Sequence, residues 1–139
     1  MNAPNTILLI DDDLTTNLLN KYFAEAIDDT IDVVTVSNGK EALDFFKNND
    51  IEAIGPCFVV LDVMMPVMNA WEFLETFNQI FDAKFKEQVT ISLLTGMDSE
   101  GIAYKAKNFP LVNEVIQKPL SEDKFRALLD KHYALDLSE

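Results

Sequence analysis

The sequence has little cysteine, little glycine and no long hydrophobic run, and each shortage excludes a class of protein. The single cysteine among 139 residues, Cys57, can form neither an internal disulfide nor a thiolate metal site, which favours a reducing compartment and a cytoplasmic protein. The four glycines are too dispersed for a dinucleotide-binding turn or a Walker phosphate loop. The first apolar run is only Ile7–Ile10 and no basic segment precedes it, so we expect no signal peptide and no membrane-spanning helix.

Positive charge is also scarce, with 11 Lys and Arg against 24 Asp and Glu and a net charge of −13. This field repels nucleic-acid phosphates and anionic membrane surfaces, so direct nucleic-acid binding and membrane insertion are not expected. A hydrophobic fraction of 48%, with ten phenylalanines, suffices for an ordinary core. The length predicts one domain over residues 1–139, with a core over about residues 5–133 and loose ends at 1–5 and about 134–139.

Short apolar runs alternate along the chain with residues at helical spacing. Strands are predicted at Ile7–Ile10, Ile31–Val36, Phe58–Leu61, Val89–Leu94 and Val115–Ile116. Five helices are predicted: Leu18–Ala26 capped by Thr15 or Thr16, one from Asn38 to Phe46, Ala70–Phe81, Ser99–Ala106, and one from a Ser121 cap to His132. Because parallel neighbours need crossover connections, which helices supply, this alternation predicts an α/β fold with a doubly wound five-stranded parallel sheet.

The polar residues that follow these strands are the candidate functional residues, because ligands of such sheets bind outside the carboxyl ends of the strands. Seven residues hold these positions: Asp11, Asp12, Asp13, Asp62, Thr95, Lys118 and Pro119. Carboxylates held close together repel one another, and a bound cation relieves that repulsion. Oxygen ligands favour a hard ion such as Mg²⁺, while a lysine and a hydroxyl suit phosphoryl oxygens. The strand ends therefore predict a site for Mg²⁺ and phosphate.

Four motifs at these strand ends resemble the response-regulator receiver domain of two-component signalling. They are Ile7–Asp13 (ILLIDDD), Leu61–Pro66 (LDVMMP), Leu94–Gly96 (LTG) and Gln117–Leu120 (QKPL). The motifs stand in the family's order, and the resemblance extends over essentially the whole chain. The resemblance implies a (βα)5 flavodoxin-like receiver fold and a stand-alone, mostly monomeric signalling protein of the chemotaxis-regulator type rather than an enzyme.

The resemblance also implies how the carboxylates are used. Asp62 would accept a phosphoryl group from a sensor histidine kinase or a histidine phosphotransfer protein. Asp12, Asp62 and the main-chain carbonyl of Met64 would coordinate Mg²⁺, for which Mn²⁺ can substitute, and Asp11 would hold a metal-bound water.

The other strand-end residues take roles around the phosphoryl group. Thr95, Gly96 and Lys118 would contact that group and stabilise the charge spread over its oxygens. Pro119 would follow a cis peptide bond, the one X–Pro bond expected to be cis. Phosphorylation would then shift the equilibrium between two surface conformations and change the binding of an unknown downstream protein. We expect that protein on the face formed by the fourth predicted helix, the last strand and the last helix.

Four positions bear on how this sequence differs from the family pattern or controls loss of the phosphate. Val115 stands where the last strand usually carries an aromatic residue, so the usual aromatic coupling is in doubt. Ala70 stands where a glycine usually follows the Met-Pro loop. The resemblance implies that Met64 and Met97, two positions beyond Asp62 and Thr95, would lie beside the path of an attacking water. Because neither can orient that water, we expect a long-lived phosphorylated state.

Simpler interpretations exist for several of these residues. The aspartate triplet can be a turn and helix-capping cluster, with Asp13 its most ordinary member. Thr95 can be a plain strand end, and Lys118 a solvated loop lysine. We predict packing roles for the sole histidine, the tryptophan and the cysteine: His132, Trp71 and Cys57.

Two alternatives exist for the chain as a whole. An aspartyl-phosphate phosphatase of the haloacid-dehalogenase type would place similar aspartates after its first strand, but it needs a cap insertion and more length. A degenerate receiver would bind its partner without phosphate.

Overall fold

The computed structural model describes residues 3–65, 68–96 and 99–133. Five parallel strands form one sheet in the order β2-β1-β3-β4-β5. Their bounds are β1 Thr6–Ile10, β2 Asp32–Val36, β3 Cys57–Asp62, β4 Val89–Thr95 and β5 Val112–Gln117. The register aligns Ile10 with Leu61 and Thr95 with Gln117, so the carboxyl ends of the strands meet at one edge. The predicted fold class and the five predicted strands are confirmed.

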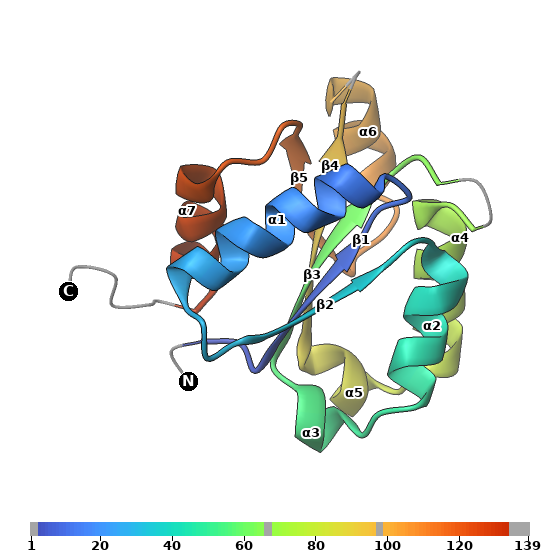
Figure 1. Ribbon diagram of the computed structural model, residues 1–139. Coiled ribbons are helices and arrows are strands. Elements are labelled where there is room, and N and C mark those ends of the chain that lie inside the picture. Colours follow the sequence, from blue (N-terminus) through green and yellow to red (C-terminus); the bar gives the residue numbers. More distant parts are fainter. Residues whose placement is uncertain (1–2, 66–67, 97–98, 134–139) are drawn as a thin grey trace.

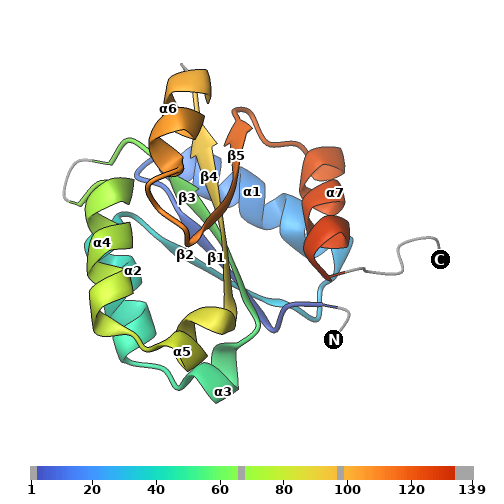
Figure 2. The ribbon, with the colours of Figure 1, turned by 180° about the vertical axis from the view of Figure 1, so that it is seen from behind.

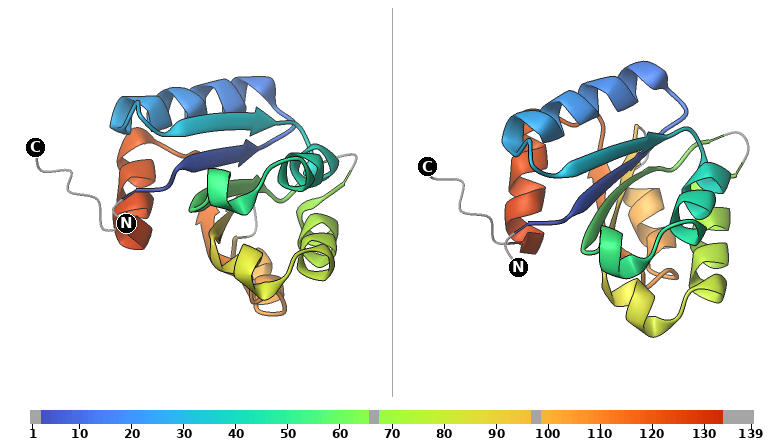
Figure 3. Two further views of the ribbon diagram at one scale, coloured as in Figure 1. Left: turned by 90° about the horizontal axis from the view of Figure 1, so that it is seen from below. Right: turned by 60° about the horizontal axis from the view of Figure 1, so that its bottom comes forward.

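Helices cover both faces of the sheet, as Figures 1 and 3 show. Helices α1 (Leu14–Ile27) and α7 (Glu122–Tyr133) lie together on one face, and α2 (Gly39–Lys47), α4 (Ala70–Ile80) and α6 (Ser99–Ala106) lie on the other. Two short helices, α3 (Ile51–Ile54) and α5 (Ala83–Glu87), lie at the edge of the sheet opposite the strands' carboxyl ends. The prediction of five helices omitted these two, because four or five residues are too short to show a helical period.

The central strands build a core on each face because alternate side chains point to opposite sides. Leu8 and Ile10 face the helices that carry Phe46 and Phe73, whereas Ile7 and Leu9 face the side that contains Phe125. All of these side chains are almost fully buried. Both faces of β1 and β3 are therefore apolar, which explains the short, uninterrupted hydrophobic runs in the sequence.

The helix caps agree with the sequence prediction in two cases and not in a third. Asn38 accepts a hydrogen bond from the Glu41 N–H (2.9 Å), and Ser121 Oγ accepts one from the Lys124 N–H (3.1 Å), as predicted. Helix α1 is capped by Asp13, not by a threonine: the Asp13 carboxylate accepts hydrogen bonds from the N–H groups of Thr15 (2.9 Å) and Thr16 (3.4 Å). Both threonines lie inside the helix, whose first turn begins earlier than the apolar spacing indicates.

The sequence prediction was also wrong at two further places. Asn5 is not part of a loose end, since its N–H donates to Pro56 O (2.8 Å) and its carbonyl oxygen accepts from the Asp32 N–H (3.1 Å). The Lys118–Pro119 bond is cis, as the resemblance implies, but the Gly55–Pro56 bond is cis as well.

Helix α1 buries polar residues and exposes several apolar ones, the reverse of the usual pattern. The residues it buries are Asn17, Asn20 and Ala24. Four large apolar side chains on the same helix are instead about half exposed or more: Leu14 (72%), Leu18 (67%), Leu19 (49%) and Tyr22 (66%). The apolar stripe of α1 therefore faces solvent, and core packing does not explain it.

Candidate functional site

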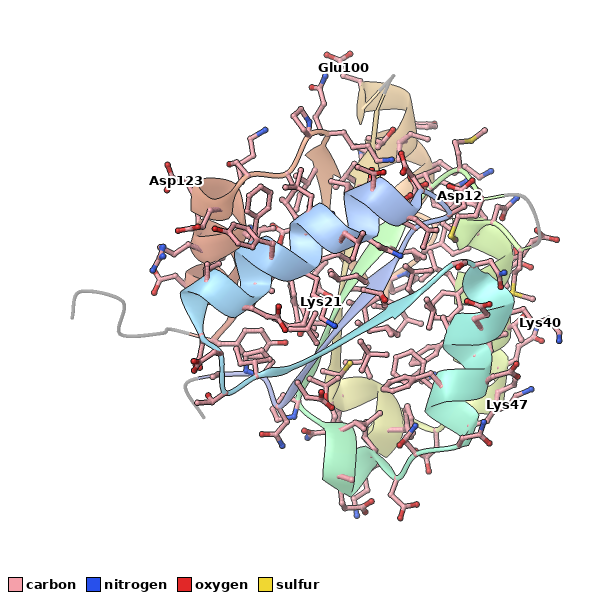
Figure 4. The ribbon with its side chains drawn as sticks, in the orientation of Figure 1. Asp12, Lys21, Lys40, Lys47, Glu100 and Asp123 are labelled. Carbon is pink, nitrogen blue, oxygen red and sulfur yellow. The ribbon has the colours of Figure 1, made fainter. Side chains whose placement is uncertain are left out.

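Three carboxylates meet where β1 and β3 end. Asp11 and Asp12 follow β1, and Asp62 is the last residue of β3. One carboxylate oxygen from each lies within 4.8 Å of the others, and Asp11 and Asp62 are buried while Asp12 is exposed. Figure 4 places Asp12 at the start of α1, on the edge of the sheet where the strands end. Residues 50 positions apart in the sequence thus form one acidic cluster.

Lys118, which follows β5, connects this cluster to the ends of β4 and β5. Its Nζ lies 3.1 Å from Asp62 Oδ1 and 3.5 Å from Asp11 Oδ2. Its main-chain N–H donates to Thr95 O (2.8 Å), so the lysine is attached to the end of β4 as well as to the cluster. Thr95 itself is buried at the end of β4. The structure therefore brings Asp11, Asp62, Thr95 and Lys118 together, and Lys118 is no free loop lysine.

The aspartate triplet divides into three different environments. Asp11 points inward, where its Oδ1 accepts a hydrogen bond from the Asp13 N–H (2.9 Å). Asp12 joins the cluster from the exposed side, and Asp13 caps α1. The capping interpretation thus holds for Asp13 alone.

Asn17 supports the site, and the sequence analysis did not single it out. Its Nδ2 donates to the main-chain oxygens of Asp11 (3.0 Å) and Val36 (3.0 Å), so it ties α1 to the ends of β1 and β2. The sequence shows only an asparagine within a predicted helix. Its burial becomes apparent only once the inner face of α1 is known.

The electrostatics of the cluster disfavour two charged carboxylates. Burial raises the pKa of Asp62, and the neighbouring Asp11 charge raises it further, against the hydrogen bond and charge of Lys118. Burial likewise raises the pKa of Asp11, against the Asp13 N–H and Lys118. For Lys118, burial lowers the pKa, but the interactions with Asp62 and Asp11 outweigh burial and leave it raised. One ammonium therefore does not fully balance the buried carboxylates.

These residues fit a divalent cation. Asp11 Oδ2 is a buried oxygen with no hydrogen-bond partner among the described residues, and its nearest cation is the Lys118 ammonium at 3.5 Å. All donors in the cluster are carboxylate oxygens, which is the donor type that Mg²⁺ selects.

The remaining predicted site residues lie around this cluster or outside the described residues. Met64 follows Asp62 by two positions, and its side chain is 73% exposed. Gly96 follows Thr95, and a Cβ at that position would meet only Lys118 Cδ, at 3.7 Å. Met97 and Pro66 lie outside the described residues.

The residues predicted to pack do so. Cys57 is fully buried, and burial raises the pKa of its thiol. Trp71 lies against Phe109, with ring centroids 5.1 Å apart, and the Lys105 ammonium lies 4.7 Å from its ring centroid.

His132 packs beside Phe58 and also takes part in a polar cluster that the sequence analysis missed. Its Nε2 lies 2.6 Å from Glu114 Oε2, and the same glutamate pairs with Lys131 (3.0 Å) and accepts from Ser92 Oγ (3.1 Å). Glu114 thereby links β4, β5 and α7.

Comparison with known proteins agrees with this fold. The family model of the response regulator receiver domain matches residues 7–130. The chain therefore belongs to the response regulator receiver domain family, whose members are signalling domains of two-component systems.

Individual relatives are distant. The chain is 27% identical, over 126 residues, to the probable C4-dicarboxylate response regulator DctR of Bacillus subtilis (strain 168). The match covers 91% of this chain and 51% of that protein, so the chain spans about half the length of this curated relative.

Solved structures share the fold over nearly the whole chain. The two component response regulator from Cytophaga hutchinsonii superimposes with a TM-score of 0.78 at 25% identity, covering 93% of this chain and 96% of that one. The receiver protein from Dyadobacter fermentans gives 0.79 at 18% identity, with 91% and 95% covered. The chemotaxis protein CheY4 of Vibrio cholerae gives 0.74 at 22% identity, with 93% and 98% covered. Among the described residues, no helix is both long and apolar enough to cross a membrane.

Proposed function

We propose that this chain is a phosphorylation-dependent switch in which Asp62 accepts the phosphoryl group. The observation that carries the proposal is the grouping of the buried Asp62 carboxylate, two further carboxylates and the Lys118 ammonium at one edge of the sheet. In the reaction, an Asp62 oxygen forms a bond to phosphorus while the bond from phosphorus to the donor's imidazole nitrogen breaks. That nitrogen keeps the electron pair, and Asp62 becomes an acyl phosphate.

Mg²⁺ is the cofactor that the donor set supports, and Mn²⁺ can take its place because it accepts the same oxygen ligands. Asp12 and Asp62 would hold the ion together with the main-chain carbonyl of Met64, and Asp11 would hold it through a bound water. When bound, the ion neutralises charge on the transferring oxygens.

Lys118 and Thr95 would stabilise the phosphoryl group once it is on Asp62. The Lys118 ammonium already lies 3.1 Å from the oxygen of Asp62, close to where phosphoryl oxygens would lie. The Thr95 hydroxyl is at the end of the neighbouring strand and can donate to another of these oxygens. A Cβ at Gly96 would meet only Lys118 Cδ, at 3.7 Å, so Gly96 would leave a donor room to approach beside Lys118.

The exposed stripe on α1 supports a docking surface for the phosphodonor, a histidine kinase or histidine phosphotransfer protein. Leu14, Leu18 and Tyr22 follow one another at intervals of four residues and are 72%, 67% and 66% exposed. The stripe begins two residues after Asp12, the exposed member of the acidic cluster. A partner that lies along α1 would therefore bring its phosphohistidine to Asp62.

The face formed by α6, β5 and α7 supports a separate surface for a downstream protein (Figure 2). Residues 99–133, which build it, carry six Lys and Arg against five Asp and Glu, whereas residues 1–98 carry five against 17. Tyr104 on α6 is 74% exposed there. Because this surface lacks the strong negative charge of residues 1–98, it can bind an acidic partner that the rest of the molecule repels.

Intact mass after incubation with acetyl phosphate tests the proposal. The wild type is expected to gain the mass of one phosphoryl group in the presence of Mg²⁺ and not in a chelator. Asp62→Asn is expected to gain none. An added phosphoryl group that persists in Asp62→Asn contradicts the assignment.

The same measurement separates the two alternative functions. A degenerate receiver would show no added mass in the wild type under any condition. A phosphatase would release phosphate from a generic phosphate ester in many turnovers, which the proposed switch would not do.

A further inference from the structure

Gly39, the first residue of α2, makes an unusually close contact with the loop that joins β3 to α4. Its N–H donates to Met68 O at 3.2 Å. A Cβ at position 39 would lie 2.9 Å from Met68 Cγ, 3.0 Å from Met68 O and 3.0 Å from Phe73 Cβ. These separations are shorter than packed atoms tolerate, so a larger residue fits only if the loop or α4 moves.

Backbone conformation does not account for this glycine. None of the described glycines has a positive φ, so Gly39 occupies a conformation open to other residues. In a helix, alanine is favoured over glycine by about 1 kcal/mol. The contact with Met68 and Phe73 is therefore the feature of the structure that requires glycine here.

The loop in contact with Gly39 leads directly from the acidic cluster. After Asp62, the Val63 N–H donates to Leu94 O (3.2 Å), and the Ala70 N–H donates to Val63 O (3.5 Å). Met64 directly follows Val63, and Met68, which accepts the Gly39 hydrogen bond, lies two residues before Ala70. A shift of Met68 would therefore reach Met64 through Ala70 and its hydrogen bond to Val63.

We infer that Gly39 is a positioning residue for the metal site, because its contact with Met68 helps to fix Ala70 and, through the Ala70–Val63 hydrogen bond, the residue that precedes Met64. Mg²⁺ demands near-ideal octahedral geometry at about 2.0–2.1 Å, so a displacement of a few tenths of an ångström weakens its binding. The inference rests on the proposed function, in which Asp12, Asp62 and the Met64 carbonyl bind the ion.

The test compares Gly39→Ala with Gly55→Ala, a matched control at the other end of β3. A Cβ at Gly55 would lie 2.8 Å from Ile51 O and 3.0 Å from Gln88 Cβ, so the control is crowded to a similar degree far from the cluster. Mn²⁺ binding is measured by the electron paramagnetic resonance signal of the free ion. Gly39→Ala is expected to bind Mn²⁺ about tenfold more weakly than the wild type. Gly55→Ala is expected to keep the wild-type affinity, although both variants lose thermal stability.

Equal Mn²⁺ affinities of Gly39→Ala and the wild type would overturn the inference, and so would equal losses in the two variants. Where Gly39→Ala does not fold, the double variant Gly39→Ala, Met68→Ala replaces it, since it removes the nearest contact; about threefold weakening is expected. A wild type that binds no Mn²⁺, or an Asp12→Ala variant that binds it equally well, would instead refute the proposed metal site.

Discussion

Replacing Asp62 with asparagine is expected to stabilise the metal-free protein while abolishing phosphorylation. Asp11 and Asp62 are each 4% exposed, and their carboxylate oxygens lie within 4.8 Å. Two unit charges at that separation repel by about 3–4 kcal/mol at an effective dielectric constant of about 20. Lys118, at 3.1 Å and 3.5 Å from the two carboxylates, offsets part of this repulsion. We expect a net gain of about 1–2 kcal/mol, or a Tm higher by about 3–7 °C for a chain of this length.

The pH dependence of this gain follows from the direction of the pKa shift. Burial and the charge of Asp11 raise the pKa of Asp62 in the folded protein. The folded state therefore holds the proton more tightly than the unfolded chain, whose aspartates titrate near about 3.9. The destabilisation of the wild type by charged Asp62 is absent below the pKa of Asp62 in the unfolded chain. It develops as the pH rises through the higher pKa of Asp62 in the folded protein. The difference in Tm between Asp62→Asn and the wild type is expected to be full near neutral pH and to shrink on acidification.

Thermal unfolding followed by circular dichroism in a chelator measures the effect. Asp12→Asn is the matched control, because it removes an exposed carboxylate of the same cluster and is expected to change stability by less than about 0.5 kcal/mol. Added Mg²⁺ is expected to raise the Tm of the wild type more than that of Asp62→Asn. A lower Tm for Asp62→Asn in chelator, or equal shifts for both variants, would refute the electrostatic reasoning.

Three further predictions concern the ion, the lifetime of the phosphate and the response of the surface. Asp12→Ala is expected to weaken Mn²⁺ binding strongly in paramagnetic resonance titrations, whereas Asp13→Ala is expected to lower stability by about 1 kcal/mol through loss of the α1 cap and to leave the ion affinity unchanged; equal losses of affinity would show that the ligands are misassigned. The double variant Met64→Asn, Met97→Glu is expected to lose its phosphoryl group faster than the wild type by intact mass, since polar groups can orient water; an equal or slower decay would contradict the shielding role of the methionines. Amide exchange with a phosphoryl mimic bound is expected to change over residues 95–117, and a change confined to residues 62–68 would argue against a switch on that face.

Much of the fold could be predicted from the sequence because the central strands are buried on both faces. Ile7–Ile10 and Phe58–Leu61 are apolar without interruption, and no helix of useful length fits in four residues. The predictions that failed concerned features that depend on tertiary contacts. The start of α1 was misplaced because Asp13 and the threonines after it are all capable caps, and the cis bond at Pro56 is set by its surroundings rather than by its neighbours in sequence.

The candidate site could be predicted to the extent that its residues end strands. Asp11, Asp62, Thr95 and Lys118 are adjacent in space because parallel strands bring their carboxyl ends to one edge, a consequence of topology alone. Gly39 could not be found in this way, since its importance depends on a distance to Met68 across 29 positions.

Under the proposed function, Lys118 would carry a change at Asp62 to the surface without the aromatic side chain that is usual at the position of Val115. The lysine is held at two points: its Nζ by Asp62 (3.1 Å) and its main-chain N–H by Thr95 O (2.8 Å). A phosphoryl group on Asp62 would interact with both the Lys118 ammonium and the Thr95 hydroxyl. It would therefore pull on the ends of β4 and β5 at the same time. Glu114 of β5 is in turn bonded to Ser92 of β4 and to Lys131 of α7. A displacement of β5 relative to β4 is therefore expected to affect α7, because the carboxylate of Glu114, a β5 residue, bonds to both β4 and α7.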